Sequence, residues 1–423
     1  MPLLVTGVRH KMASIEVRER FALLESEIEP AGQHLRALPG IEECAFLTTC
    51  NRSEIYAHVS DTETALASIR EFYRQFKQVD SHAYRPHLFT LLDDDVVTYL
   101  FRVASGLDSL ILGEGQILGQ VKDMLATAHR LHTSGPLLDK LFKSALTVGK
   151  RVRTETGIAQ KDVSVSRSAF ELAHQLFPDL MDRRIALVGG GKMVAILLSA
   201  IQNQMAPRQY DNVTIVNRSQ HRLETLTARY GFKGCLFSDL DAVLDDAEIL
   251  FVATGAPHVI LGEKHFAGRA DKLVIDISVP RNVDPTVADL PNVRLFNTDS
   301  LANVNTLPQD TQSLLTEQAE DIIHEEYRHF MEWQHARPIV PLISQLRSKL
   351  EHLRREELSE QFGALLTEDP ALQLADNLSK NLLKKILHAP TIRMKTRLAR
   401  QQLHAAALAE LFDLDPLSGP QRS

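Results

Sequence analysis

The chain has 423 residues, of which 44% are hydrophobic and 24% charged, and its net charge is -7. These values are typical of a globular protein of about three domains, and they argue against a surface that binds nucleic acid throughout. No apolar run approaches the ~20 residues of a membrane helix and the first residues resemble no signal peptide, so we expect a cytoplasmic protein. The cysteines are odd in number and lack C-x-x-C pairing, so we expect neither a disulfide framework nor a metal site.

The first part of the chain predicts a small sheet with helices packed on it. Strands are expected at residues 3–8 and 54–59, and a third strand ends in the apolar run 45–47, shortly before Cys50. Helical periodicity predicts helices over residues 15–24, 28–38, 62–76 and 94–105. This alternation favours an α+β or α/β fold for the N-terminal domain.

Cys50 is the first candidate functional residue. Its thiol stands where a buried strand meets the polar residues Thr49, Asn51 and Arg52. A guanidinium two residues away, together with unpaired backbone N–H groups at such a turn, would favour the thiolate, which is the nucleophilic form. The alternative is a small, inert core residue, because most free cysteines are of that kind.

Residues 102–122 combine glycines and polar side chains in an otherwise apolar segment. The polar residues are Ser109, Glu114 and Gln116, and the glycines are Gly106, Gly113, Gly115 and Gly119. Glycine lets a backbone approach a ligand closely, and polar side chains on an apolar loop often line a site. Ordinary turn chemistry explains the glycines equally well.

The pattern from residue 121 to residue 156 is helical. Its later part carries a basic stripe of Lys140, Lys143, Lys150, Arg151 and Arg153. Such a stripe is usually a solvated face, and a contact with nucleic acid is the alternative.

A second region begins near residue 157 and predicts a nucleotide-binding sheet. The strand 183–188 leads through a glycine-rich turn into an apolar helix at 195–201. The turn consists of Gly189, Gly190, Gly191, Lys192, Met193 and Val194. Glycines allow the tight turn and the approach of a pyrophosphate, which the N–H groups of the helix N-terminus can bind. Val194 stands where this pattern has Gly or Ala, which predicts a wider separation of strand and helix.

The next strand, 213–216, ends in Asn217, Arg218 and Ser219. An acidic residue at this place would hold the ribose 2′-hydroxyl of NAD, whereas these three residues suit a 2′-phosphate, so we expect NADP. Further strands of a doubly wound parallel sheet are expected at residues 233–237, 248–253 and 272–277. A sheet of this kind that binds no nucleotide is the alternative.

Beyond residue 296 glycine becomes rare and the pattern is helical. Apolar residues from 315 to 331 predict one helix of about thirty residues, which Asp299 or Ser300 would cap and Pro338 and Pro341 would end. Further helices are expected at residues 343–353, 371–388 and 391–411. A helical tail with an apolar stripe is typical of a dimerisation module. The alternative is a contact with phosphates through Lys384, Lys385, Arg393, Lys395, Arg397 and Arg400.

Several motifs, in this order along essentially the whole chain, resemble the glutamyl-tRNA reductase family. They are GVRHKMASIEVRERF, TTCNRSEIY, FRVASGLDSLILGEGQILGQVK, KRVRTETGI, the glycine turn, NRS, VIDISVPRNVDP and HAPT. The resemblance implies NADPH-dependent reduction of the glutamyl group on its tRNA to glutamate-1-semialdehyde, the first committed step toward 5-aminolevulinate and tetrapyrroles.

The resemblance also implies an architecture and a partner. It divides the chain into a catalytic domain (1–157), a Rossmann NADPH domain (158–298) and an all-α dimerisation domain with a long spinal helix (299–423). The chain would form a homodimer. Glutamate-1-semialdehyde aminomutase, which acts next in the pathway, is a candidate partner.

Residue roles follow from the same resemblance. Cys50 would attack the aminoacyl ester and hold the glutamyl group as a thioester, which hydride from NADPH reduces. Arg52 would bind the side-chain carboxylate of the glutamyl group with two hydrogen bonds, and Glu114 would suit its α-ammonium group. The other matching substrate positions are Thr49, Asn51, Ser109, Gly115, Gln116 and Gln120. The turn from Gly189 to Val194 would hold NADPH.

Two positions depart from the family pattern. Tyr99 stands where the family usually has a histidine that is important for activity. A phenol can donate a hydrogen bond to an oxyanion but is a poor proton carrier, because its pKa lies near ~10. We therefore expect slower turnover, unless His10, His58 or His87 supplies the proton. Gly115 replaces the usual proline and is expected to loosen its loop.

Two other functions stay open at this point. One is a thioester-forming NADP semialdehyde dehydrogenase that acts on a small acyl phosphate, although this function explains neither the basic stripes nor the helical tail. The other is a non-catalytic NADP-binding member of the same family. An assay with charged glutamyl-tRNA and NADPH separates the three, because semialdehyde forms only with the reductase.

Overall fold

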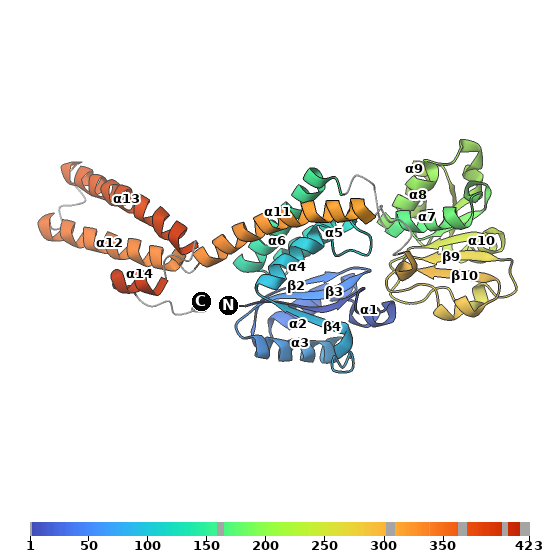
Figure 1. The fold of residues 1–423 in the computed structure, drawn as a ribbon, viewed down its shortest axis with the longest axis horizontal. Helices are drawn as coiled ribbons and strands as arrows, with labels where there is room; N and C mark the ends of the chain where they lie inside the picture. Colours follow the sequence, from blue (N-terminus) through green and yellow to red (C-terminus); the bar gives the residue numbers. More distant parts are fainter. Residues whose placement is uncertain are drawn as a thin grey trace. The chain divides into compact units, whose positions relative to one another are not determined.

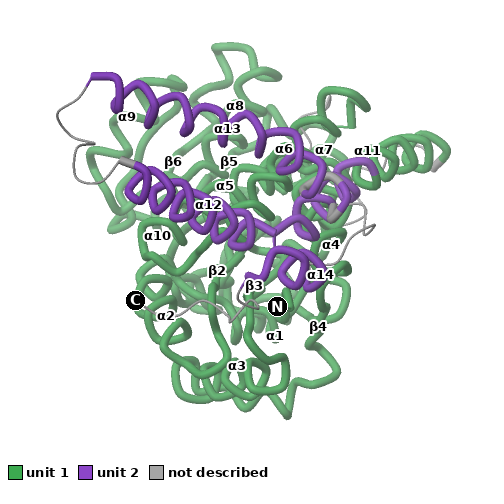
Figure 2. Tube along the Cα trace, turned by 90° about the vertical axis from the view of Figure 1, so that its left-hand side faces the viewer, with its two compact units in different colours: residues 1–324 green, residues 325–423 purple. Residues whose placement is uncertain are grey.

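The computed structural model describes residues 2–158, 165–301, 309–337, 339–362, 370–399 and 405–414. The chain forms two compact units, residues 1–324 and 325–423 (Figure 2).

The first unit begins with an antiparallel sheet of four strands in the order β2-β3-β1-β4. The strands are β1 (Leu3–Arg9), β2 (Ile41–Thr48), β3 (Arg52–Val59) and β4 (Leu88–Leu92). Every residue of β3 is buried, because helices cover both faces of the sheet (Figure 1). The strands expected at 3–8 and 54–59 are confirmed. The patterns did not predict β4, which is short and lies at the edge.

Six helices pack on this sheet. They are α1 (Ile15–Phe21), α2 (Glu25–Arg36), α3 (Thr62–Phe76), α4 (Asp94–Ala104), α5 (Gln116–Arg130) and α6 (Pro136–Thr156). Helices α2 and α3 lie on one face, and α4, α5 and α6 lie on the other (Figure 1). The helices expected at 15–24, 28–38, 62–76 and 94–105 are confirmed, with ends that differ by a few residues.

The helical pattern from residue 121 to residue 156 is two helices, not one. Gly135 and Pro136 separate α5 from α6, because proline cannot continue a helix but fits the first turn of the next. The carboxylate of Glu43 then accepts hydrogen bonds from the backbone N–H groups of Gly135, Leu137 and Leu138. This contact caps the start of α6 and fixes it to β2.

The second sheet of this unit has six parallel strands in the order β10-β9-β8-β5-β6-β7. They are β5 (Ile185–Val188), β6 (Val213–Asn217), β7 (Lys233–Leu236), β8 (Ile249–Val252), β9 (Lys272–Asp276) and β10 (Val293–Asn297). The order reverses between β5 and β8, which is the switch point where doubly wound sheets bind nucleotides. The Rossmann prediction is confirmed, although β10 was not foreseen.

Helices cover both faces of the parallel sheet. They are α7 (Val165–Leu176), α8 (Lys192–Gln202), α9 (Gln220–Tyr230) and α10 (Leu240–Asp246). Strand β5 shows how the strands serve two cores: Ile185 and Leu187 pack with α7, α8 and α9, whereas Ala186 and Val188 pack with α10. This is why the parallel strands read as continuous apolar runs.

The rest of the described chain is helical. It contains α11 (Gln309–Ala336), α12 (Ile339–Phe362), α13 (Pro370–Ala399) and α14 (Ala405–Leu411). In the second unit, a small core joins α12 to α14 through Ile339, Leu342, Ile343 and Leu408. No helix in the described ranges is long and apolar enough to cross a membrane.

Three expectations for this helical part are corrected. Asp299 and Ser300 lie in a short 3-10 helix, Thr298–Leu301, and do not cap α11, which starts at Gln309. Pro341 lies in the first turn of α12, where proline is tolerated, and does not end a helix. Helix α13 runs through Pro390 without ending. Pro338 and Arg400 lie outside the described residues.

Candidate active site

Cys50 lies in the tight turn between β2 and β3. The turn is closed by the Thr49 N–H, which donates to the Arg52 carbonyl at 2.8 Å, and by the Asn51 N–H, which donates to the Thr49 hydroxyl at 3.1 Å. These two backbone N–H groups are therefore not free to stabilise a thiolate. The Cys50 side chain is half-buried and packs against an apolar cluster that includes Ile111 and Leu110.

The expectation of a low thiol pKa is wrong for this conformation. Burial raises the pKa of Cys50 to about 12, and the nearby Glu114 carboxylate raises it further. Arg18 and Arg52 act in the opposite direction but do not outweigh burial. The thiol is protonated at neutral pH, so a nucleophilic attack by Cys50 requires a base.

Arg18 on α1 fixes the position of the Cys50 turn, and the sequence reasoning missed it. Its Nε donates to the Cys50 carbonyl at 3.2 Å, and its Nη1 donates to the Ala13 carbonyl at 2.9 Å. Its Nη2 forms an ion pair with Asp299 at 2.7 Å. The side chain is buried. A signal was present, because Arg18 occupies the apolar face of the helix between Ile15 and Phe21.

Arg52 is fully buried and its two Nη atoms are already used. Nη1 donates to Glu54 at 3.0 Å and to the Tyr99 hydroxyl at 2.8 Å, and Nη2 donates to the Asp108 carbonyl. The Nη pair that a bidentate contact with a substrate carboxylate requires is therefore not free. Arg52 is the first residue of β3, and its contacts instead anchor the start of this strand beneath the Cys50 turn.

Tyr99 on α4 belongs to the same buried network. Its hydroxyl donates to Glu54 and accepts from Arg52. Burial and the Glu54 carboxylate raise the pKa of this phenol far above its ordinary value. The proton that was expected to reach an oxyanion at Cys50 is thus donated to Glu54. The structure gives Tyr99 the role of a support for Arg52.

The segment between α4 and α5 brings the other expected substrate residues to the first sheet. Glu114 is buried, and burial raises its pKa to about 7 against the opposing effect of Arg52 and Arg153. Ser109, Gln116 and Gln120 are half-buried.

The glycines of this segment serve backbone packing. Gly106 and Gly113 have positive φ angles of +76° and +78°, and a Cβ on Gly113 would lie 2.5 Å from the Ile158 carbonyl oxygen. Gly115 caps α5 with a φ of -68°, and Gly119 lies inside that helix. Turn chemistry, not close approach to a ligand, therefore explains Gly106 and Gly113.

Arg153 on α6 was predicted as part of the basic stripe, but its side chain contacts the segment between α4 and α5. Its Nη2 donates to the carbonyls of Glu114 and Gly115, at 3.1 and 2.7 Å. A solvated face does describe its neighbours, since Lys143 pairs with Asp139 and Arg151 with Glu155. The stripe is thus heterogeneous, and Arg153 holds the start of α5.

Some buried polar atoms on the segments near the Cys50 turn have no hydrogen-bond partner, as is also the case elsewhere in the described chain. Within the described residues they include His10 Nδ1, Asn51 Oδ1, Arg52 Nε, Gln116 Nε2 and Arg153 Nε. A buried polar atom without a partner costs about 1–3 kcal/mol, so native structures rarely keep one unless water or a ligand completes it.

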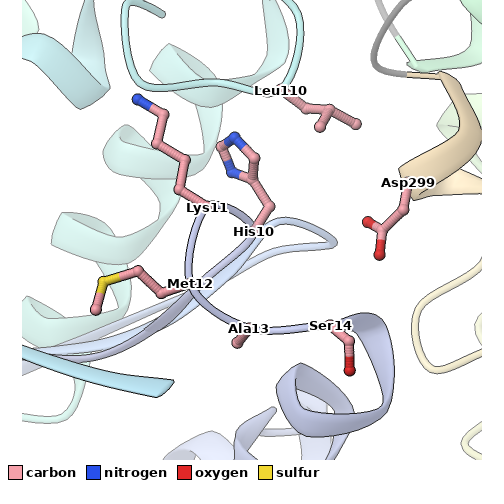
Figure 3. A pocket seen from close by; sticks show the side chains of 7 residues that line it. All are labelled: His10, Lys11, Met12, Ala13, Ser14, Leu110 and Asp299. Carbon is pink, nitrogen blue, oxygen red and sulfur yellow. The ribbon is translucent and has the colours of Figure 1, made fainter. Parts of the chain in front are cut away.

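A pocket of about 450 Å³ lies at the end of β1 (Figure 3). It is lined by His10, Lys11, Met12, Ala13, Ser14, Leu110 and Asp299. The His10 N–H donates to the Asn51 carbonyl at 2.9 Å, which joins the pocket wall to the turn. Figure 3 shows the His10 ring pointing toward the segment that carries Leu110, with Asp299 on the opposite side of the pocket.

The glycine turn after β5 has the shape of a phosphate cradle. Gly189 has a φ of +129°, and a Cβ there would lie 2.2 Å from the Ala253 carbonyl oxygen. A Cβ on Gly190 would lie 2.2 Å from Asn217 Nδ2, whereas nothing lies within 4 Å of one on Gly191. Helix α8 starts at Lys192 with Gly191 as its cap, so its first N–H groups face this open space.

The end of β6 completes this second site. Asn217 Nδ2 is buried without a partner in the described residues, and Arg218 is exposed. Ser219 caps α9 by accepting from the Arg222 N–H at 3.4 Å. Arg222, which sequence reasoning missed, lies against Gly190: its Cδ is 3.2 Å from where a Cβ would stand. Arg218 and Arg222 together offer two cations to a 2′-phosphate.

The first unit holds a Rossmann sheet whose glycine turn is open to a ligand, and a second sheet that presents a thiol. These two features define the class of this protein: it is a dinucleotide-binding protein with a separate thiol site. Comparison with known proteins specifies the family. The chain matches the models of the glutamyl-tRNAGlu reductase N-terminal domain over residues 6–156, of shikimate/quinate 5-dehydrogenase over 171–304 and of the glutamyl-tRNAGlu reductase dimerisation domain over 318–414.

Full-length relatives agree. The chain is 38% identical to the glutamyl-tRNA reductase of Rippkaea orientalis, over 98% of this chain and 99% of the relative. It has the same identity to that of Synechocystis sp., again over 98% and 99%. The solved glutamyl-tRNA reductase of Methanopyrus kandleri is 23% identical, covers 97% of this chain and 99% of its own, and has a TM-score of 0.44. The chain belongs to the glutamyl-tRNA reductase family.

Proposed function

We propose that this protein reduces the glutamyl group of glutamyl-tRNA to glutamate-1-semialdehyde, with NADPH as the reductant and with release of the tRNA. It is an oxidoreductase of tetrapyrrole biosynthesis, as its family membership implies. The structural observation that carries the proposal is the Cys50 turn, which the His10 backbone N–H and the Arg18 side chain hold in place. A small acyl phosphate dehydrogenase would not account for the match to the dimerisation domain.

Cys50 is the proposed nucleophile. Its sulfur attacks the ester carbonyl, the ribose oxygen of the tRNA leaves with the proton of the thiol, and the glutamyl group stays on the sulfur as a thioester. NADPH, when bound, would supply the hydride that converts this thioester to the aldehyde, and the thiolate that leaves takes up a proton to return the thiol. Arg18 holds the Cys50 carbonyl and so keeps the turn in place during both steps.

The remaining site residues bind the glutamyl group. Thr49, Asn51, Ser109, Gln116 and Gln120 supply hydrogen bonds. Gly115 shapes the turn, and Arg52 offers only its Nε. Glu114 accepts the α-ammonium group: its pKa of about 7 falls when a cation binds beside it. Arg52 and Tyr99 support the turn from below.

The glycine turn from Gly189 to Val194, with Lys192 and Met193 in the first turn of α8, is the proposed NADPH site. The two positions that exclude a Cβ and the open space at Gly191 fit a diphosphate. Asn217, Arg218 and Ser219 lie at the ribose end, and the unpaired amide of Asn217 fits a ligand there. Arg222 extends this set.

A homodimer follows from the second unit. Helix α13 exposes Leu374, Leu378, Leu382 and Ile386, whose exposed fractions are 67%, 68%, 56% and 59%. Their spacing of four residues places them on one side of the helix. A continuous apolar stripe in water favours association, and the dimerisation-domain match makes a second copy of the chain the partner.

Three further points belong to the proposed function. They are the domain limits near 157 and 298, a cytoplasmic location and contact with the aminomutase.

The deciding experiment uses the full-length protein, charged glutamyl-tRNA and NADPH. We expect semialdehyde and free tRNA from the parent and from Cys235→Ser, which removes a thiol of the other sheet. Cys50→Ser should form no semialdehyde and should melt like the parent. Without NADPH, mass spectrometry of the parent should show a glutamyl adduct on the Cys50 peptide. Activity that survives Cys50→Ser, or turnover without this adduct, would refute the proposal.

A further inference from the structure

His10 is held beside the nucleophile by the backbone of both segments. It follows β1 directly, and the last residue of β1, Arg9, pairs with Arg52 in the sheet. Its own N–H donates to the Asn51 carbonyl, the residue after Cys50. The two strand ends therefore hold the His10 backbone against the Cys50 turn, and His10 also lines the pocket.

The chemistry of Cys50 needs a group that carries a proton. The thiol must lose one, because burial keeps it protonated, and the departing ribose oxygen must gain one, because an alkoxide is a poor leaving group. The Tyr99 proton is donated to Glu54. His58 is paired with Glu43, and the half-buried His87 contacts the Met12 carbonyl.

His10 has the properties that this task requires. Its Nδ1 is buried and has no partner within the described residues. Burial lowers its pKa to about 4, and Arg52, Lys11 and Arg18 act in the same direction against Asp108. The ring is therefore neutral at pH 7 and can accept a proton. Its low pKa makes it a weak base toward the thiol and makes its imidazolium a strong acid toward the departing oxygen.

The pocket beside His10 suits the sugar end of the substrate. Asp299 offers carboxylate oxygens to ribose hydroxyls and is held by Arg18, the residue that also binds the Cys50 carbonyl. Met12 and Leu110 add apolar surface for a base. The volume of about 450 Å³ accommodates one nucleoside.

We propose that this pocket binds the 3′-terminal nucleoside of the tRNA and that His10 transfers the proton of the Cys50 thiol to the departing ribose oxygen. In this step the S–C bond forms, the C–O ester bond breaks, and the proton passes from sulfur through imidazole to oxygen. No external proton is consumed. The inference rests on the proposed function, since it needs an aminoacyl ester as the substrate.

The leaving group supplies the test. Acylation of Cys50 is measured in a single turnover without NADPH, once with glutamyl-tRNA and once with the 4-nitrophenyl ester of the glutamate α-carboxyl. Nitrophenolate can leave as an anion, whereas the ribose oxygen needs a proton to leave. His10→Gln should slow acylation from the tRNA by about 10²–10⁴-fold, the usual contribution of acid–base catalysis. The loss with the activated ester should be at least about ten times smaller.

Controls separate the possible outcomes. His82→Gln, which changes an exposed histidine of another pocket, should acylate like the parent. Free imidazole should restore part of the acylation rate of His10→Ala. Equal losses with both esters would show that His10 does not protonate the leaving oxygen, and no loss would show no role; either result overturns the inference while the proposed function stands. Failure of the parent to become acylated by glutamyl-tRNA would overturn the proposed function itself.

Discussion

The two sheets of the first unit build their sites by different physical means. At the nucleotide turn the backbone does the work: glycines exclude side chains, and a helix N-terminus provides the donors. At the Cys50 turn, buried charged side chains hold the backbone in place. Arg18 contacts the turn from one side, and the Arg52–Glu54–Tyr99 network supports it from below. The first kind of site should therefore be sensitive to added volume, and the second to lost charge.

The largest expected effect is Gly189→Ala. The new Cβ would lie 2.2 Å from a backbone carbonyl at a φ of +129°, which combines strain with overpacking and costs about 4 kcal/mol in all. Gly191→Ala is the matched control, because that Cβ meets open space. Chemical denaturation should show a large fall in the free energy of unfolding for the first variant only. Similar stability of the two would contradict a backbone-determined cradle.

Glu114→Gln tests the buried charge at the other site. Burial raises the carboxyl pKa from its ordinary 4.5 to about 7, so ionisation is easier in the unfolded chain, and the parent loses stability as the pH rises from 4.5 through 7. The variant escapes this loss. It should match the parent near pH 4 and exceed it at pH 8 by as much as about 3 kcal/mol. The exposed Glu63→Gln should follow the parent at both values.

Glu114→Gln should also weaken the binding of glutamyl-tRNA. Without the carboxylate the α-ammonium group loses its partner, so KM for glutamyl-tRNA should rise about tenfold or more, with a smaller change in kcat. Thermal unfolding at several pH values measures the stability, and steady-state kinetics measures KM. A variant that is less stable than the parent at pH 8 would show that Glu114 is a structural ion partner instead.

Arg18→Met removes two hydrogen bonds to buried carbonyls and the ion pair with Asp299. The methionine keeps most of the volume, so the expected cost is about 2 kcal/mol of unfolding free energy. Acylation of Cys50 should slow more than this stability loss suggests, by about 10–100-fold, because the turn is no longer held. Arg74→Met, at an exposed pair on α3, is the control. Normal acylation in Arg18→Met would contradict its positioning role.

Arg222→Ala tests the contact with the 2′-phosphate at the nucleotide site. If this guanidinium meets the 2′-phosphate, KM for NADPH should rise about tenfold, or about 1.4 kcal/mol, while KM for NADH should stay unchanged. Arg229→Ala, on the same helix but at its other end, should leave both constants unchanged. An equal rise for both cofactors would place Arg222 away from the 2′-phosphate.

The difference between the sites also explains what the sequence predicted. The parallel sheet follows from apolar runs and glycine spacing, because both are local signals. Among the described strands, the sequence did not predict β10, at one edge of the parallel sheet, or β4, at one edge of the antiparallel sheet. The Arg18 clamp joins residues 281 positions apart, and no local pattern reports such a pairing. The low thiol pKa was inferred from the nearby Arg52, but in the folded chain burial outweighs that charge.

The smallest expected effect concerns Gly115, which was expected to loosen its loop. In the structure its carbonyl accepts from Arg153 and its φ is -68°, the angle that proline prefers at the start of a helix. Gly115→Pro should therefore raise the unfolding free energy by about 0.4–1 kcal/mol, because the unfolded chain loses freedom. Gly119→Pro, inside α5, should destabilise instead. If Gly115→Pro stabilises the chain while acylation keeps its rate, Arg153 already holds the loop in its active shape, and the glycine costs stability but not activity.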